Sequence, residues 1–172
     1  MGLFTSSAAL NTFDELFVEQ LQDLYDAEQR LTKALPKMAE AAHSPALKSA
    51  FEEHLRQTHN HVTRLEQVFK SIGQSAQSKT CAAMKGLVEE GSEVISANGD
   101  PNVKDAALIA AAQRVEHYEI AGYGTVRTFA QRLGKSEAAR LLQETLNEEA
   151  ETDKKLTGLA ERAINPKAAA MA

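Results

Sequence analysis

Five amphipathic segments divide the sequence, and within each of them apolar residues return every three or four positions. Four of the segments are long, and they cover about residues 12–43, 45–73, 101–134 and 136–164; a shorter one covers 80–97. Such spacing gathers apolar side chains on one face of an α-helix. The pattern predicts an all-α protein with four long helices and one short helix.

Residues with capping chemistry mark the first helix boundaries. Thr12 and Glu15 have the spacing of a capping box at the start of the first helix. Ser44 and Pro45 fit the N-cap and first helical position of the second helix. Pro36 lies inside the first amphipathic segment, where the missing backbone N–H predicts a kink.

The lengths of the connections predict how the helices are arranged. Tight turns near Ser44 and Gly134 join the long helices into two hairpins, whose partners must be antiparallel. A polar linker, 74–79, and the short helix connect the hairpins. Two helical hairpins joined by one long crossover are the ferritin-like four-helix connectivity. An ordinary up-down bundle with a decorated loop is the alternative.

The ends of the chain are predicted to lie outside the folded domain. We assign residues 12–164 to the helical domain, 1–11 to a flexible N-terminus and 165–172 to a frayed tail. Ser136 is expected to cap the last helix, which should end before Asn165 because Pro166 follows.

Composition supports the helical interpretation and excludes several functions. Hydrophobic residues make up 43% of the chain, aromatic residues only 5%, and Trp is absent, which suits helices more than a β-sandwich. The net charge of −5 and the lack of a basic stripe argue against nucleic acid as a partner. With Cys81 alone, no internal disulfide can form, and no apolar run is long enough to span a membrane. We therefore expect a cytoplasmic protein without a membrane partner.

Carboxylates interrupt the apolar faces of three long helices. Glu28 lies on the apolar face of the first helix, and Glu119 lies on that of the fourth, with Glu116 one turn earlier. Glu149 lies on the apolar face of the last helix, with Asp153 one turn later. An unpaired carboxylate in a core is very costly unless it is protonated, paired or bound to a metal.

The second helix places histidines at the same depth as these carboxylates. His54 and His61 are seven residues apart and therefore nearly eclipsed on one face. Folding the hairpins about their turns brings these polar positions to within a turn of one another. Oxygen and nitrogen ligands suit iron or manganese, so the pattern predicts such an ion inside the bundle. The spacing leaves open which members of two sets face the site: His54, Gln57, Thr58 and His61 in the first, Glu148 and Glu149 in the second.

Three stretches carry a family resemblance: Leu21–Glu28, Asp105–Gly124 and Leu141–Glu149. In these stretches, and over nearly the whole chain, the sequence resembles the YciE/YciF family. That resemblance implies a ferritin-like fold, an association with bacterial stress and an iron site; the family has no defined biochemical activity. Ferritin-like di-metal proteins use a Glu from each of two helices and a Glu-x-x-His pair from each of the other two. Here Thr58 stands where the second helix would carry that Glu, so a partial or single-metal site is also open.

Two functional hypotheses follow. The first is a metal-binding stress-response protein with a carboxylate-rich site, and the sequence leaves open whether it is an enzyme. The alternative is a non-catalytic helical protein with a structural or interaction role and no bound metal. A surplus of alanines on the fourth helix, such as Ala106 and Ala110, also predicts a homodimer.

Overall fold

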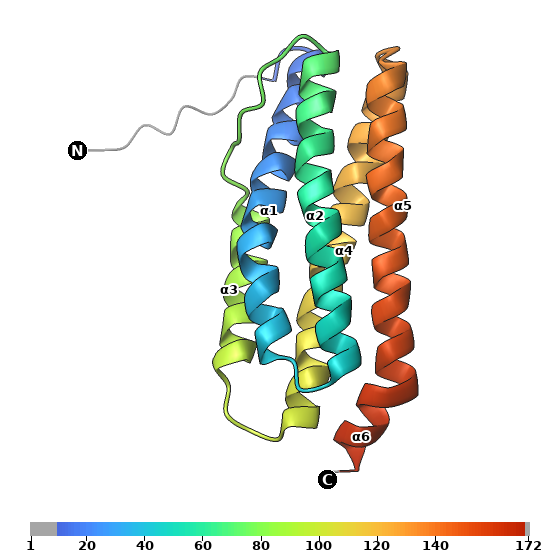
Figure 1. Cartoon of the computed structure of the whole chain (residues 1–172). Coiled ribbons are helices and arrows are strands. Elements are labelled where there is room, and N and C mark those ends of the chain that lie inside the picture. The colour runs from blue at the N-terminus through green and yellow to red at the C-terminus, as the bar shows by residue number, and fades with distance from the viewer. Residues whose placement is uncertain (1–9, 171–172) are drawn as a thin grey trace, which may run out of the picture.

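The computed structural model describes residues 10–170, which are almost entirely helical (Figure 1). The elements in that range are α1 (Phe13–Ala41), α2 (Pro45–Ser71), α3 (Ala82–Ser96), α4 (Pro101–Arg132), α5 (Ser136–Leu159), a π-helical segment η1 (Ala160–Ile164) and α6 (Asn165–Ala169). Most of the predicted flexible N-terminus, residues 1–9, lies outside the described residues, as do residues 171–172 of the predicted tail.

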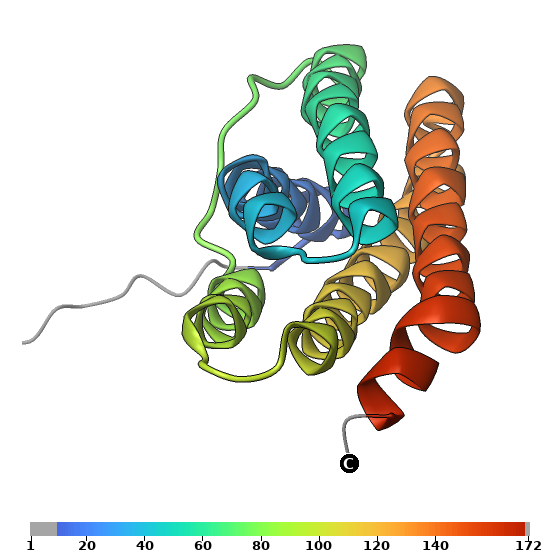
Figure 2. The same ribbon diagram turned by 60° about the horizontal axis from the view of Figure 1, so that its bottom comes forward.

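The four long helices form a bundle of two antiparallel hairpins. α1 pairs with α2, and α4 pairs with α5, while α2 packs on α5 and α1 packs on α4. The crossover after α2 runs back along α1 before α3 begins (Figure 1). α3 packs outside the bundle against α1 and α4, as the end-on view shows (Figure 2). The predicted all-α, ferritin-like architecture with an extra helix in the crossover is confirmed. Within residues 10–170, no helix is both long and apolar enough to cross a membrane.

Buried apolar side chains form two cores, one toward each end of the bundle. The core near the α1–α2 turn includes Leu35, Leu47, Phe51, Leu108 and Leu156. The core near the α4–α5 turn includes Phe17, Leu21, Phe69, Tyr123 and Leu142. On α2, α4 and α5, the stretch between the contributions to the two cores carries buried polar residues instead, and on α1 the buried Glu28 lies where the two cores meet. The bundle therefore has a polar layer between two apolar cores.

The hairpin turns follow the predicted boundaries, with changes in how they are capped. The Thr12–Glu15 capping box is present. Ser44 is the N-cap of α2, but its side chain makes no capping hydrogen bond. Instead, the Asp105 carboxylate of α4 accepts hydrogen bonds from the backbone N–H groups of His43 and Ser44, at 2.8 and 2.7 Å. A buried residue from the other hairpin thus fixes this turn.

The last helix differs from the prediction at both ends. Lys135, rather than Ser136, is its N-cap, and it follows Gly134, whose φ of 70° suits the turn. The helix does not end before Asn165. It passes through the π-helical segment η1 into α6, where Pro166 occupies the first turn and therefore needs no backbone donor.

A glycine allows α1 and α4 to approach closely beside the polar layer. A Cβ atom added at Gly122 would lie 2.7 Å from Cδ2 of Leu24. Real carbon atoms do not approach so closely, so a larger residue would displace Leu24 or separate the helices. The separation of α1 and α4 in turn sets how near Glu28 lies to the carboxylates of α4.

Candidate metal centre

Six ionisable side chains from all four long helices meet in the polar layer. None is more than 3% exposed. They are Glu28 from α1, His54 and His61 from α2, Glu116 and Glu119 from α4, and Glu149 from α5. Each occupies a position that the helical period assigns to the bundle interior, which is why the sequence could identify them.

The six side chains form two overlapping groups of donor atoms. His54, Glu116, Glu119 and Glu149 each offer one atom to a group whose members all lie within 4.8 Å of one another. Glu28, His61 and Glu149 form a second such group. We call these the His54 half and the His61 half of the centre. Glu149 belongs to both, so its two oxygens connect the halves.

In the His54 half, one ring nitrogen of the histidine faces carboxylates, and the other makes only a long contact. Nε2 of His54 lies 3.3 Å from an oxygen of Glu116 and 3.9 Å from one of Glu149. On the other side of the ring, Nδ1 lies 3.4 Å from the Thr152 hydroxyl. Neither carboxylate oxygen of Glu119 has a hydrogen-bond partner.

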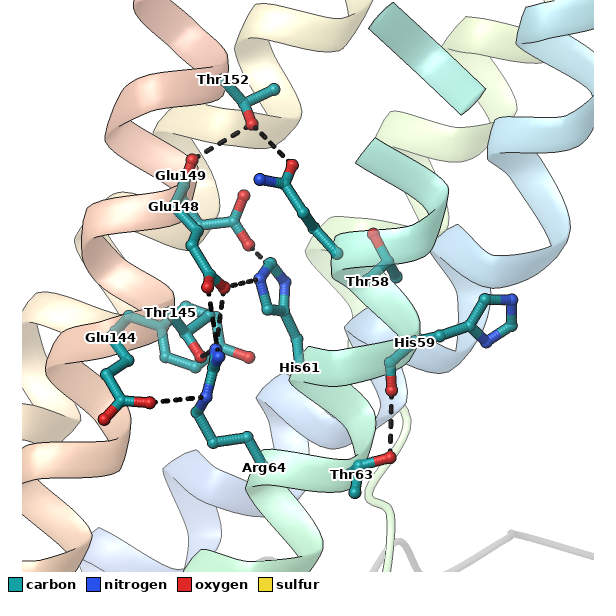
Figure 3. Close-up of polar contacts among 12 residues, drawn as sticks. Thr58, His59, His61, Thr63, Arg64, Glu144, Thr145, Glu148, Glu149 and Thr152 are labelled. Atoms are coloured by element: carbon teal, nitrogen blue, oxygen red, sulfur yellow. Dashed lines mark hydrogen bonds and ion pairs between the residues drawn. The ribbon is translucent and has the colours of Figure 1, made fainter. Parts of the chain in front are cut away.

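In the His61 half, the histidine is held between carboxylates on both sides. Nδ1 of His61 lies 2.9 Å from Glu149 and 3.3 Å from Glu28. Nε2 lies 2.7 Å from Glu148, whose carboxylate is also bound by Arg64 at 2.9 and 3.2 Å. Figure 3 shows His61 between Glu148 and Glu149, with Arg64 beyond Glu148. On the opposite side of the centre, the Tyr123 hydroxyl donates to Glu28.

Unsatisfied polar atoms are concentrated in this layer. Among the described residues, nine buried side-chain nitrogen and oxygen atoms lack a hydrogen-bond partner, and eight of them belong to the six side chains. Buried polar groups in proteins are nearly always satisfied, so a cluster of exceptions indicates a missing partner. Within residues 10–170, two imidazoles and the Tyr123 hydroxyl are the donors that face these four carboxylates, and they leave most of the carboxylate oxygens without a hydrogen bond. A cation among these atoms would satisfy both the oxygens and the free imidazole nitrogens.

Burial keeps the His54 half in a largely uncharged form. It raises the pKa of Glu119 well above the usual value, and the negative charges of Glu28 and Glu149 add to the effect. The pKa of Glu116 is raised in the same way by burial and by Glu149. Burial also lowers the pKa of His54, which leaves its imidazole neutral. A neutral imidazole has a lone pair available to a metal.

In the His61 half, ion pairs favour the charged forms of His61, Glu148 and Glu149, whereas burial raises the pKa of Glu28. Burial opposes the protonation of His61, but Glu28, Glu148 and Glu149 outweigh it and raise the pKa of this imidazole to about 12. The hydrogen bond from His61, helped by Arg64, lowers the pKa of Glu148 to about 2. Burial alone would raise the pKa of Glu149, yet contact with His61 holds it below its usual value.

The structure settles which of the alternative residues face the centre. Both His54 and His61 do, and Glu149 faces inward while Glu148 lies behind His61. Thr58 is buried, but its hydroxyl donates to the backbone carbonyl of His54 rather than to the cluster. Gln57 lies to the side, within 3.4 Å of the Thr152 hydroxyl.

Asp153 is the predicted ligand that the structure does not place in the centre. Its carboxylate accepts a hydrogen bond from Gln113 at 2.9 Å and lies 3.3 Å from His117, a largely exposed side chain. Asp153 is level with Glu116, as the hairpin geometry predicted, but it points to the edge of the α4–α5 interface. The predicted depth of Asp153 along the bundle was correct, but its side chain does not point into the centre; the preceding residue on α5, Thr152, lies nearer to His54.

Sequence reasoning missed the residues that support the ligands. Arg64 carries no pattern that distinguishes it from a solvated charge, and its bonds to Glu148 and Thr145 depend on α2–α5 packing. Tyr123 is fully buried, and its hydroxyl donates to Glu28 across the α1–α4 interface, a contact that the helical period of α4 does not reveal.

Comparison with known proteins agrees with this fold. The model of the family described as "Domain of unknown function (DUF892)" matches residues 12–169. Protein YciF of Escherichia coli K12 is 49% identical over 160 residues, which are 92% of this chain and 96% of YciF. The crystal structure of that E. coli stress protein matches with a TM-score of 0.87 over 90% of this chain and 98% of the other.

Two further solved structures are similar. YcfI of Rhodopseudomonas palustris, whose description suggests a structural protein, is 43% identical with a TM-score of 0.85, covering 88% of this chain and 96% of YcfI. A protein of Xanthomonas campestris pv. campestris has a TM-score of 0.68 at 23% identity, covering 87% of this chain and 90% of the other, and shows the shared fold alone.

Proposed function

Because this chain belongs to the DUF892 family and is 49% identical to the E. coli stress protein YciF, we propose that it is a stress-response protein that binds iron or manganese inside its bundle. The observation that carries the proposal is a set of eight buried nitrogen and oxygen atoms that have no hydrogen-bond partner, on six side chains that converge from all four long helices. These are the oxygen and imidazole donors that iron and manganese accept.

The two halves of the centre would each bind one metal ion. The His54 half offers four donors, including a neutral imidazole, and would take the first ion. The His61 half offers three donors, of which Glu149 is shared, and would take a second ion after His61 gives up a proton. When bound, iron or manganese supplies Lewis-acid and one-electron chemistry.

The protein's own residues shape the surroundings of the centre. The apolar cores on either side limit the entry of water along the bundle axis. Glu148 and Arg64 fix the orientation of the His61 ring, in the way that carboxylates behind metal-binding histidines do. Between α2 and α5, Gln57 and Thr152 separate the His54 half from an open surface depression lined also by Glu53 and Lys155. We place the entry route for ions there.

Metal content tests the proposal directly. Protein purified without a histidine tag or chelator should contain iron or manganese in near-stoichiometric amount by elemental analysis. Adding Mn²⁺ to the metal-free protein should raise its melting temperature, because the ion binds only the folded state. Less than about a tenth of an ion per chain, together with an unchanged melting temperature at saturating Mn²⁺ and Fe²⁺, would refute it.

A structural role without metal is the second candidate, favoured by the description of the similar YcfI. Under that hypothesis the buried carboxylates would remain protonated or paired, and metal would leave stability unchanged. The melting experiment therefore separates the two candidates. We place either function in the cytoplasm.

The homodimer remains a prediction with less support than the sequence suggested. Ala106 packs against the core and Ala111 is buried beside α3, so packing within the chain uses part of the alanine surplus on α4. Ala110 is exposed and still available to a second copy. Light scattering across a range of protein concentrations would measure the mass of the particle in solution, and the mass of a single chain at every concentration would contradict the homodimer.

A further inference from the structure

A surface cavity lies between α1, α3 and α4, away from the metal centre. Its volume is about 270 Å³, and residues of α1, α3 and α4 line it. Figure 2 shows α3 flanking the bundle beside α1 and α4. None of the six side chains of the metal centre lines it. Its contents therefore need not touch the metal ligands.

The walls of this cavity are mainly apolar, with Gln29 and Ser92 as the uncharged polar residues among them. Leu31 and Met38 of α1, Val115 of α4, and Leu87 and Ile95 of α3 line it. Gly91, in the middle of α3, contributes no side chain, and a Cβ atom added there would meet no other atom within 4 Å. The missing side chain thus leaves open space in the wall where a residue of ordinary size would project.

The rim on α1 is positively charged. Lys33 and Lys37 are exposed on successive turns beside the opening, and neither takes part in an ion pair between residues 10 and 170. Asp26, the one acidic residue at the rim, is already neutralised: it pairs with Arg30 at 2.6 Å and accepts the backbone N–H of Cys81 at 2.8 Å. Two free positive charges therefore stand beside an apolar cavity.

We propose that this cavity binds an anionic amphiphile, a carboxylic acid with an unbranched aliphatic chain of medium length. The chain would lie along Leu31, Leu87 and Ile95, and the carboxylate would reach Lys33 and Lys37. Mainly apolar walls offer few hydrogen-bond partners to a sugar, and a positive rim repels cationic amphiphiles. This cavity is independent of the proposed metal function, because no residue that lines it is one of the six proposed metal ligands.

Chain length provides the first test. Isothermal titration with hexanoate, octanoate and decanoate should show saturable 1:1 binding that tightens by about fourfold for each added methylene until the cavity is full. 1-Octanol should bind more weakly than octanoate. Affinity that does not change with chain length, or no saturable binding at all, would overturn the proposal.

Matched variants test each part of the site. Lys33→Gln with Lys37→Gln should weaken octanoate binding by about twofold to tenfold and leave 1-octanol unchanged. Lys48→Gln with Lys70→Gln removes the same charge from exposed positions on α2 and should have no effect. If both pairs weaken octanoate equally, the carboxylate is not held at this rim.

Filling the cavity is the most selective change. Gly91→Leu should abolish the binding of both octanoate and 1-octanol, whereas Gly86→Leu, on the same helix but outside the lining, should not. Both variants should fold, since neither glycine has positive φ and both positions have room for a Cβ atom. Equal binding by the two variants would contradict the assignment. Octanoate binding should be the same with and without added Mn²⁺, so this outcome is separate from that of the metal proposal.

Discussion

The two halves of the candidate centre contain similar residues but differ in what surrounds them. In the His61 half, the imidazole contacts Glu28 and Glu149 on one side and the Glu148–Arg64 pair on the other, so its charge is balanced by the protein. In the His54 half, Glu119 has no partner for either oxygen, and His54 is neutral. In the first arrangement the protein itself compensates the buried charges, whereas the second leaves buried oxygens uncompensated until a cation binds.

The shared carboxylate tests whether the halves form one centre. Glu149→Gln removes the charged oxygens that face both histidines. We expect metal affinity to fall by at least about 100-fold, since the loss exceeds that for a residue behind a ligand. Isothermal titration with Mn²⁺ would measure it. Glu151→Gln, exposed and two residues away, is the control. Equal affinities for the two variants would place the ion elsewhere.

Separate histidine variants distinguish the order in which the halves fill. His54→Ala should weaken the first binding event by at least about tenfold, because it removes the neutral imidazole from the four-donor group. His61→Ala should leave that event within about threefold of wild type and remove a second one. The reverse order would show that the ion pairs around His61 prepare that half for metal instead of competing with it.

The fold was largely predictable from the sequence because it depends on the spacing of apolar residues. The difference between the His54 half and the His61 half was not predictable in this way. Leu21, Leu24, Leu31 and Leu35 define the interior of α1, and that period alone placed Glu28 among them. The roles of Glu148 and Glu149 depend on rotation of α5 by one position, which periodicity does not resolve. Arg64 and Asp105 act across helix interfaces, where only packing brings donor and acceptor together. The end of the last helix was misjudged because Pro166 fits the first turn of α6.

The metal-free protein should respond in opposite directions to changes in the two halves. Glu119→Leu removes two unpartnered oxygens and should raise the free energy of unfolding at neutral pH by about 1–3 kcal/mol. Glu148→Gln removes the acceptor of a buried, charged histidine and should lower it by about 1–3 kcal/mol. Urea unfolding in the presence of a chelator measures both. Changes of the same sign would contradict the contrast between the halves.

The pH dependence of that stability is a smaller effect with a defined sign. Burial raises the pKa of Glu119 in the folded state, so its contribution is fully present below the unfolded value near 4.5 and is lost as pH rises through the folded pKa. The pKa of Glu148 is lowered to about 2, so its contribution is present above 4.5 and is lost as pH falls toward 2.

It follows that the stability gained by Glu119→Leu should shrink as pH falls from 7 toward 4.5. The stability lost in Glu148→Gln should shrink only below 4.5. Thermal unfolding of wild type and both variants in chelator, at half-unit pH steps, would trace these windows. A Glu119→Leu gain that is constant across the range would mean that Glu119 is ionised in the folded protein.

An anaerobic ferrous titration of wild type and the Glu28→Ala–Glu119→Ala double variant most directly tests whether the polar layer binds metal. One residue is removed from each half, and far-ultraviolet circular dichroism would verify that the variant remains helical. We predict saturable binding of one or two ions per wild-type chain and none above background in the variant. Equal binding by both proteins, whether strong or negligible, would contradict the assignment of these buried carboxylates as a metal centre.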